Sequence, residues 1–68
     1  MKIQYWNHRG WKYQVRELLG SYKAFYCTNG NTVWHSCQGF LLRSNEQEAQ
    51  ADLDRYAKIH GFTKEVSD

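Results

Sequence analysis

The segment Trp11-Lys12-Tyr13-Gln14-Val15-Arg16 determines how the rest of the sequence is interpreted. Apolar and polar residues alternate along it with a period of two, which is typical of a strand that buries one face and exposes the other. If the odd-numbered residues pack under a covering element, the even-numbered residues form a polar, basic face on the opposite side; the pattern leaves open which face is covered.

Further strands are predicted on both sides of this segment. Downstream, Thr28-Asn29-Gly30-Asn31 separates two β-prone runs at residues 22–27 and 32–37, and Asn-Gly favours a two-residue type I′ hairpin turn. Upstream, Asn7-His8-Arg9-Gly10 is expected to be the turn that follows a short first strand at residues 2–5. Leu18-Leu19-Gly20-Ser21 breaks the alternation and links the second strand to the third.

A helix is predicted between a start signal and a stop signal. Ser44-Asn45-Glu46-Gln47 has the pattern of a capping box, and Gly61 stands where a left-handed residue ends a helix. Acidic residues are concentrated in the first part of the segment, as the helix dipole favours. One face at helical spacing is expected to pack on the sheet, and it carries Ala49, Leu53, Tyr56, Ala57 and His60.

These elements predict an α+β fold, in which a small antiparallel sheet of three to four strands is followed by one C-terminal helix packed on one face. The chain has 68 residues, which is enough for one domain with a modest core. Aromatic residues make up 16% of it, so the core is expected to consist largely of rings. We expect the domain to span residues 1–62, and residues 63–68 to form a frayed tail with little to bury.

Composition and cysteine placement limit the setting of the protein. No run of about 18 apolar residues is present, so we expect no transmembrane helix and no membrane partner. The first residues lack the apolar stretch of a secretion signal, which makes a cytoplasmic location, in a bacterial or phage setting, the default. With Asn29-Gly30 as the turn, Cys27 and Cys37 fall on opposite faces and roughly 16 Å apart, at about 3.3 Å per residue. Two free thiols are therefore expected.

Neither metal binding nor catalysis is predicted. His35 and Cys37 share one face of a predicted strand, but the paired spacing of zinc ligands is not repeated elsewhere. A cysteine–histidine pair also needs a cleft and a third group to orient the base, which a sheet of this size does not offer. The protein is therefore expected to bind a partner without being an enzyme, and to use no cofactor and no metal.

Charge separates the chain into a basic sheet and an acidic helix. Residues 1–23 carry five cations and one acid, whereas from Ser44 onward six acids outnumber three cations. A basic sheet face with an aromatic residue among the charges suits contact with phosphates and stacked bases. The predicted nucleic-acid-binding residues are Arg9, Lys12, Gln14, Arg16 and Lys23.

A protein partner is the alternative that the sequence leaves open. Large rings are too numerous for so small a core, and exposed tryptophan anchors protein interfaces. The predicted interface residues are Trp6, Trp11 and Trp34. An exposed edge strand adds a route to strand addition or to a homodimer. In this alternative the protein is a phage or plasmid module that binds a host protein.

The order of strands, Asn-Gly turn and helix resembles the amino-terminal arm-binding domains of phage integrases. The similarity is carried by Tyr22-Lys23-Ala24-Phe25-Tyr26 and by Gly39-Phe40-Leu41-Leu42-Arg43-Ser44-Asn45-Glu46-Gln47-Glu48-Ala49, and covers about residues 11–60. Those domains read DNA with the sheet, so the resemblance implies a sheet that enters the major groove with Lys12, Gln14, Arg16 and Lys23, while Arg9 reaches a phosphate. Unlike that family, the sequence has no recombinase domain after the helix, so we expect either an accessory or regulatory DNA binder or a protein that does not bind DNA.

Overall fold

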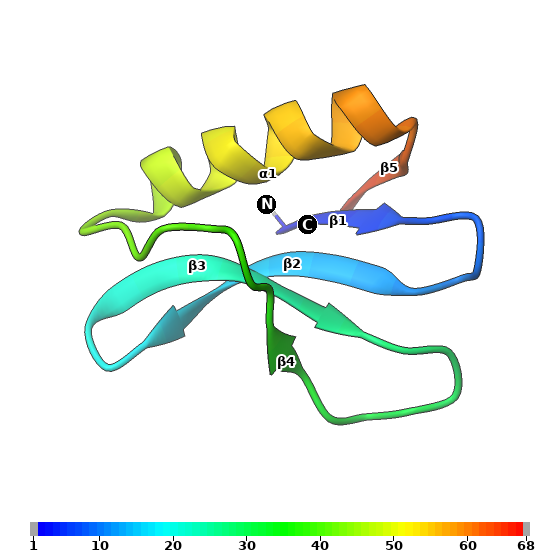
Figure 1. Cartoon of the computed structure of the whole chain (residues 1–68), viewed down its shortest axis with the longest axis horizontal. Helices are drawn as coiled ribbons and strands as arrows, with labels where there is room; N and C mark the ends of the chain where they lie inside the picture. The colour runs from blue at the N-terminus through cyan, green and yellow to red at the C-terminus, as the bar shows by residue number, and fades with distance from the viewer. Residues whose placement is uncertain (1, 68) are drawn as a thin grey trace.

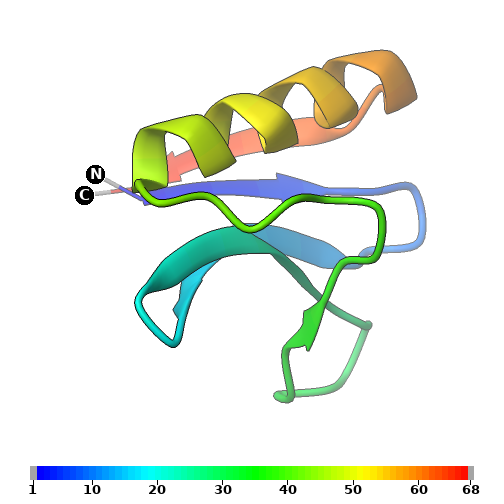
Figure 2. The ribbon, with the colours of Figure 1, turned by 60° about the vertical axis from the view of Figure 1, so that its left-hand side comes forward.

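Residues 2–67, which the computed structural model describes, form one antiparallel sheet of five strands and one helix (Figure 1). This confirms the predicted α+β class, with more strands than the three to four expected. The sheet order is β4-β3-β2-β1-β5, and the helix lies on one side of it (Figure 2). The elements are β1 (Lys2–Trp6), β2 (Lys12–Leu18), β3 (Ser21–Cys27), β4 (His35–Ser36), α1 (Glu46–His60) and β5 (Thr63–Ser67).

The core lies between α1 and the central strands. Tyr13 of β2 pairs with Tyr5 of β1 on one side and with Tyr26 of β3 on the other, so the three rings share the face that α1 covers. The helix therefore covers the face that carries the odd-numbered residues of β2, which the sequence had left open. The buried residues of this core are Tyr5, Tyr13, Ala24, Cys37, Leu53 and Ala57.

Aromatic rings fill most of the space under the helix. The ring of Tyr13 stacks on that of Phe62, with centroids 4.8 Å apart, and lies 6.4 Å from that of Tyr56. Small alanines on α1 let the helix approach the sheet closely, and Leu53 fills the space between them at 0% exposure. A core of rings, alanines and one leucine is how so short a chain buries enough apolar surface.

A hydrogen bond joins the first strand to the helix. The Tyr5 hydroxyl donates to Asp54 Oδ1 over 2.6 Å, and Gln50 Nε2 donates to the same oxygen over 3.0 Å. Burial, and next the hydrogen bond to Asp54, raise the pKa of Tyr5 to about 12. The hydroxyl therefore stays protonated at neutral pH and remains the donor of this bond.

The C-terminal end of α1 follows the signal in the sequence, whereas the N-terminal cap lies one residue after Ser44, with which the predicted capping box begins. Asn45 is the N-cap residue, and its side chain accepts a hydrogen bond of 2.8 Å from the backbone N–H of Glu48. At the other end, Gly61 has φ +70°, and its N–H donates to the carbonyl of Ala57.

The type I′ turn occurs at a different position from the one predicted. Leu19 and Gly20 both have positive φ, 51° and 83°, and the register pairs Leu18 with Ser21, so this is the two-residue hairpin turn. At Asn29-Gly30, the positive φ of 81° belongs to the glycine. The prediction of a type I′ turn at Asn29-Gly30 is therefore wrong.

The second hairpin has a longer loop than predicted. Tyr26 pairs with His35 and Phe25 with Ser36, which leaves residues 28–34 in the loop and shifts the register by two residues. Local hydrogen bonds stabilise the wider turn: the Asn31 N–H donates to the carbonyl of Thr28, and the Cys27 thiol donates to that of Asn31 over 2.9 Å.

Cys27 and Cys37 are free thiols, as predicted, and both are buried. A two-residue turn at Asn29-Gly30 would place Cys37 opposite Tyr22, but the observed register differs, because the Cys37 N–H donates to the carbonyl of Ala24 over 3.0 Å. In the observed register Cys37 belongs to the helix-facing core, while alternation along β3 directs Cys27 away from it.

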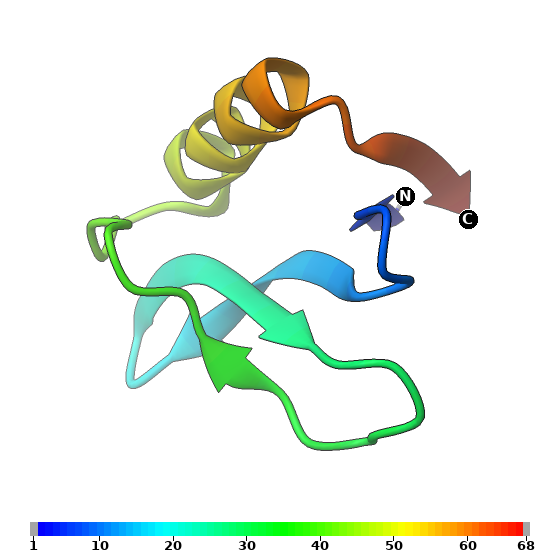
Figure 3. The same ribbon diagram turned by 45° about the vertical axis from the view of Figure 1, so that its right-hand side comes forward.

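The predicted frayed tail is a strand, and the domain boundary at residue 62 is therefore wrong. β5 pairs with all five residues of β1, from Lys2↔Ser67 to Trp6↔Thr63, and forms an edge of the sheet (Figure 3). Its side chains are all exposed, so backbone pairing stabilises it rather than burial. Phe62 packs on the core and sets the direction of the strand. Met1 and Asp68, the outer ends of the predicted ranges, lie outside the described residues.

An ion pair anchors the connection between β4 and α1. The backbones of Arg43 and Tyr22 exchange two hydrogen bonds of 2.8 Å. The Arg43 guanidinium donates to both carboxylate oxygens of Asp52, over 2.7 and 3.1 Å, and the Asp52 side chain is only 12% exposed. The hydrogen bond from Arg43 lowers the pKa of Asp52 below its ordinary 3.8.

Replacing Asp52 with asparagine should therefore destabilise the protein at neutral pH by about 1–2 kcal/mol, the difference between a charge-assisted hydrogen bond and the neutral one that asparagine can still accept. Because the folded-state pKa is lowered, this stabilisation is present above the unfolded pKa and is lost as the pH falls through the folded one. Urea denaturation of both proteins should therefore show a difference that shrinks below pH 4. Glu17→Gln, at an exposed acid on β2, is the control; an equal loss in both variants would contradict the role of Asp52.

The strained turn gives a second prediction. Leu19 is 97% exposed and has a left-handed backbone conformation, which is unfavourable for leucine and readily adopted by asparagine. Leu19→Asn should stabilise the protein by about 0.5–1 kcal/mol. Gly20→Ala, at φ 83°, should destabilise it. A lower urea midpoint for Leu19→Asn than for the unmodified protein would refute the assignment of the turn.

Candidate functional site

The face of the sheet opposite α1, called the outer face below, carries most of the predicted binding residues. Pairing places Trp6 beside Lys12, Gln14 beside Phe25, and Arg16 beside Lys23, all on this side. Sequence alternation in β2 and β3 explains the arrangement, since each buried ring is followed by a residue that points the other way. The outer face comprises Gln4, Trp6, Lys12, Gln14, Arg16, Lys23, Phe25, Trp34 and Glu65.

Two tryptophans of the outer face are paired with cations. The guanidinium carbon of Arg16 lies 4.9 Å from the centre of the Trp34 ring, and the ammonium of Lys12 lies 5.9 Å from the centre of the Trp6 ring. Both distances are within the range of a cation–π interaction. Both rings are only partly buried, so each pair presents an aromatic surface and a positive charge together.

A chain of hydrogen bonds connects these pairs across three strands. Glu65 Oε1 accepts from Gln4 Nε2 over 3.0 Å and from Trp6 Nε1 over 3.2 Å. Gln14 Nε2 donates to Gln4 Oε1 over 2.5 Å, and Arg16 donates to Gln14 Oε1 over 3.3 Å. Five side chains of the outer face are therefore linked to one another by hydrogen bonds: Gln4, Trp6, Gln14, Arg16 and Glu65.

The structure brings together most of the predicted site residues. Lys12, Gln14, Arg16 and Lys23 share the outer face with two of the three tryptophans, Trp6 and Trp34. The residues predicted for nucleic acid and those predicted for a protein partner therefore form one surface rather than two.

Arg9 and Trp11 lie elsewhere. The Trp11 ring stacks on that of Tyr26, 5.8 Å between centroids, and packs against the core on the helix side. Arg9, in the turn between β1 and β2, places its guanidinium 5.7 Å from the centre of the Trp11 ring. This third cation–tryptophan pair is therefore separate from the outer face.

Sequence reasoning missed Gln4 and Glu65. Gln4 lies in the predicted first strand, but no binding role was predicted for any side chain of that strand. Glu65 lies in the segment predicted to be frayed, and the β-branched Thr63 and Val66 on either side of it were the available signal for a strand. Glu65 places one carboxylate among the cations of the outer face.

The described residues offer no activated nucleophile at Cys37 and no metal cluster. Burial raises the pKa of the Cys37 thiol to about 11, and Lys23 opposes this effect only in part. The thiol is therefore protonated at neutral pH, whereas the thiolate is the reactive form. Within residues 2–67, three metal-ligating side chains do not come together anywhere.

Comparisons with protein-family models, with curated proteins and with solved structures found no match to this chain. In the part of the chain that the structure describes, no helix has the length and apolar character needed to cross a membrane.

Proposed function

We propose that this protein is a non-enzymatic nucleic-acid-binding protein that uses its outer face and prefers single strands. The observation that carries the proposal is the pairing of Arg16 with Trp34 and of Lys12 with Trp6 on one solvated sheet face. A flat face with rings beside cations offers a base a surface for stacking and offers the neighbouring phosphate a positive charge.

Charge supports contact with a phosphate backbone. Lys12, Arg16 and Lys23 provide three cations on adjacent strands, against the single carboxylate of Glu65. The net charge of the whole chain is only +2, but most of the acids lie on or after the helix and therefore away from these cations. Few phosphates are therefore neutralised, and we expect an affinity that is modest and falls as salt rises.

The tryptophans favour unpaired bases over a duplex. Bases in a duplex are already stacked on one another, so a ring on a flat protein face cannot reach them without distorting the helix. Bases in a single strand are free to stack, and each stacked base contributes about 1–3 kcal/mol. Trp6 lies on β1 and Trp34 precedes β4, so the two rings flank the cations on the strands between them.

The resemblance to integrase arm-binding domains supports nucleic acid as the ligand class but implies a duplex, with the sheet in the major groove. Whether the ligand is a single strand or a duplex, we place the protein in the cytoplasm of a bacterium or of a phage-infected cell, where nucleic acid is present. A protein partner bound through the same tryptophans is the competing function, and its binding would tolerate salt.

Fluorescence anisotropy with a labelled twelve-nucleotide oligo(dT) strand and with a twelve-base-pair duplex tests the proposal. At 50 mM salt the single strand should bind more tightly and should quench tryptophan fluorescence. Trp34→Ala should weaken binding about 5- to 100-fold, corresponding to one lost stacking interaction. Arg16→Gln should weaken binding and flatten its salt dependence by about one phosphate contact.

Lys58→Gln is the matched control, because it removes one cation from the exposed last turn of α1, far from the outer face in the fold. It should leave binding unchanged. Tighter binding of the duplex would overturn the preference for single strands, and no binding of either probe at low salt would overturn nucleic-acid binding altogether.

Glu65 gives a further prediction. Its carboxylate lies among the lysine and arginine side chains of the outer face. Glu65→Gln removes this negative charge, while the new amide oxygen can still accept from Trp6 and Gln4. The same anisotropy assay should show binding tightened about two- to fivefold at low salt, with the gain disappearing at high salt. Unchanged affinity at low salt would argue against phosphate contact near β5.

A further inference from the structure

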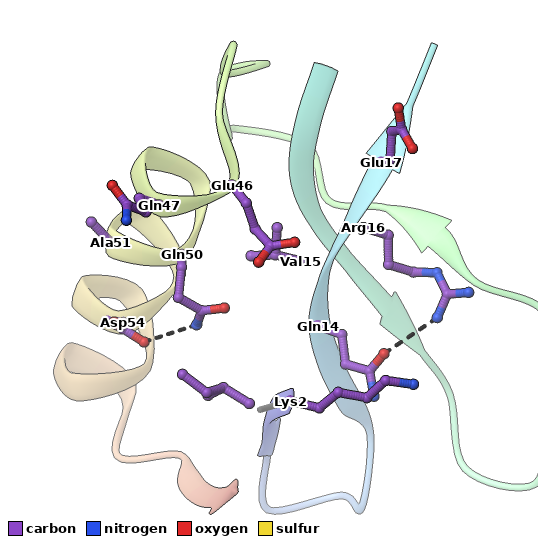
Figure 4. Close-up of a pocket in the computed structure, with 11 residues that line it drawn as sticks. Lys2, Gln14, Val15, Arg16, Glu17, Glu46, Gln47, Gln50, Ala51 and Asp54 are labelled. Carbon is purple, nitrogen blue, oxygen red and sulfur yellow. Dashed lines mark hydrogen bonds between the residues drawn. The ribbon is translucent and has the colours of Figure 1, made fainter. Parts of the chain in front are cut away.

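β1 and β2 separate after two paired residues. The β1–β2 ladder contains Tyr5↔Tyr13 and Trp6↔Lys12, although β1 continues to pair with β5 back to Lys2 and β2 continues to pair with β3 out to Leu18. Among the described residues, the outer half of β2 therefore has a strand partner on one side only. The sheet opens here into a wedge that faces the first turns of α1 (Figure 4).

The backbone groups of Val15 and Glu17 point into this opening. On β3, Tyr22 and Ala24 use their backbone groups toward the β4 side, since Tyr22 bonds Arg43 and the Ala24 carbonyl accepts from Cys37. Alternation in an antiparallel pair then directs Lys23 and Phe25 to β2, where their partners are Arg16 and Gln14. Val15 lies between Gln14 and Arg16 on β2, and Glu17 follows Arg16. Both therefore direct their backbone N–H and C=O groups away from β3.

The opening is large enough for a ligand. It forms a cavity of about 670 Å³ between β1, β2 and the helix. Val15 and Ile3 contribute apolar side chains to it, and Gln50 an amide. Figure 4 shows the Glu46 carboxylate directed from α1 toward Val15. No hydrogen bond or ion pair occupies this carboxylate among the described residues.

We propose that the opening binds an extended peptide, which adds as a short strand along the edge of β2 and directs a lysine or arginine at Glu46. The free N–H and C=O groups of Val15 and Glu17 supply main-chain hydrogen bonds, as in strand addition at any exposed sheet edge. A basic side chain opposite Val15 lies on the helix side of the sheet, where its stem contacts Val15 and its charge meets Glu46. This site borders the proposed nucleic-acid surface, because Gln14 and Arg16 also line the opening, but it does not depend on nucleic-acid binding.

The opening is fixed at its narrow end. The side chains of Gln14 and Gln4 are hydrogen-bonded across the point where β1 and β2 separate. β1 is held on its other side by five pairs with β5. Closing the wedge by moving β1 onto β2 would therefore require the β1–β5 pair to move as a unit, whereas a peptide satisfies the same backbone groups without moving either strand.

Amide hydrogen exchange of the free protein tests the opening itself. The amides of Gln14 and Arg16 should be protected because they bond to β3, and those of Val15 and Glu17 should exchange at least tenfold faster. Protection of all four amides would show that β1 closes on β2 in solution and would overturn the proposal.

Titration with the peptide acetyl-Thr-Val-Thr-Lys-Thr-Val-Thr-amide, followed by NMR of the labelled protein, tests the ligand. The amides of Val15 and Glu17 should shift and become protected, together with residues in the first turns of α1. The same peptide with glutamate in place of lysine should bind more weakly. Shifts confined to the outer face or to β4 would overturn the proposal, as would the absence of shifts at millimolar peptide.

Two matched pairs of variants separate the contributions. Glu17→Pro removes the edge N–H but none of the hydrogen bonds to β3, so it should fold and lose peptide binding, whereas Glu17→Ala should retain it. Glu46→Gln should weaken binding of the lysine peptide about threefold, as for an exposed charge pair, and Glu48→Gln should leave it unchanged. Equal binding by the two residue-17 variants would overturn the main-chain role of the edge.

Discussion

The packing of the Tyr13 ring against α1 is the contact on which the rest of the structure depends. Tyr13 lies at the centre of the sheet, pairs with Tyr5 and Tyr26 on the two neighbouring strands, and stacks on Phe62 beyond the helix. Once this ring is buried, alternation determines the orientation of every other side chain on β2. The burial of one tyrosine therefore also determines that Lys12, Gln14 and Arg16 point to solvent.

The features that the sequence predicted are those governed by local periodicity. The helix ends follow from Asn45 and Gly61, and the two faces of β2 follow from its alternation, so the outer face could be predicted together with Lys12, Gln14, Arg16 and Lys23. Local pattern does not report which strand lies next to which. For this reason the cation–tryptophan pairs across the outer face were not predictable, since Trp34 reaches Arg16 only through the arrangement of β4 beside β3.

The errors have a common physical origin in turns and edges. At Leu19-Gly20 the pairing of β2 with β3 over seven residues outweighs the strain of one leucine, so a type I′ turn forms there. Asn29-Gly30 is a stronger hairpin signal, but it lies in the β3–β4 connection, where only two residue pairs form and the loop is wider. β5 was not predicted because it buries no side chain and forms by backbone pairing with β1. An edge strand of this kind has no periodic apolar signal.

Charge at the β5 edge also bears on self-association. In a symmetric edge-to-edge pairing of two copies of β5, a register centred on Lys64 or on Glu65 places that residue opposite its own copy. Like charges directly opposite each other destabilise strand pairing, so the charges of β5 disfavour these two registers. The free edge inside the sheet, at Val15 and Glu17, has no such protection. Gln14 connects this edge to the outer face, since its amide bonds both Gln4 and Arg16. Substitutions at Gln14 therefore disturb both surfaces, and changes at Trp34 and at Glu46 are the ones that separate them.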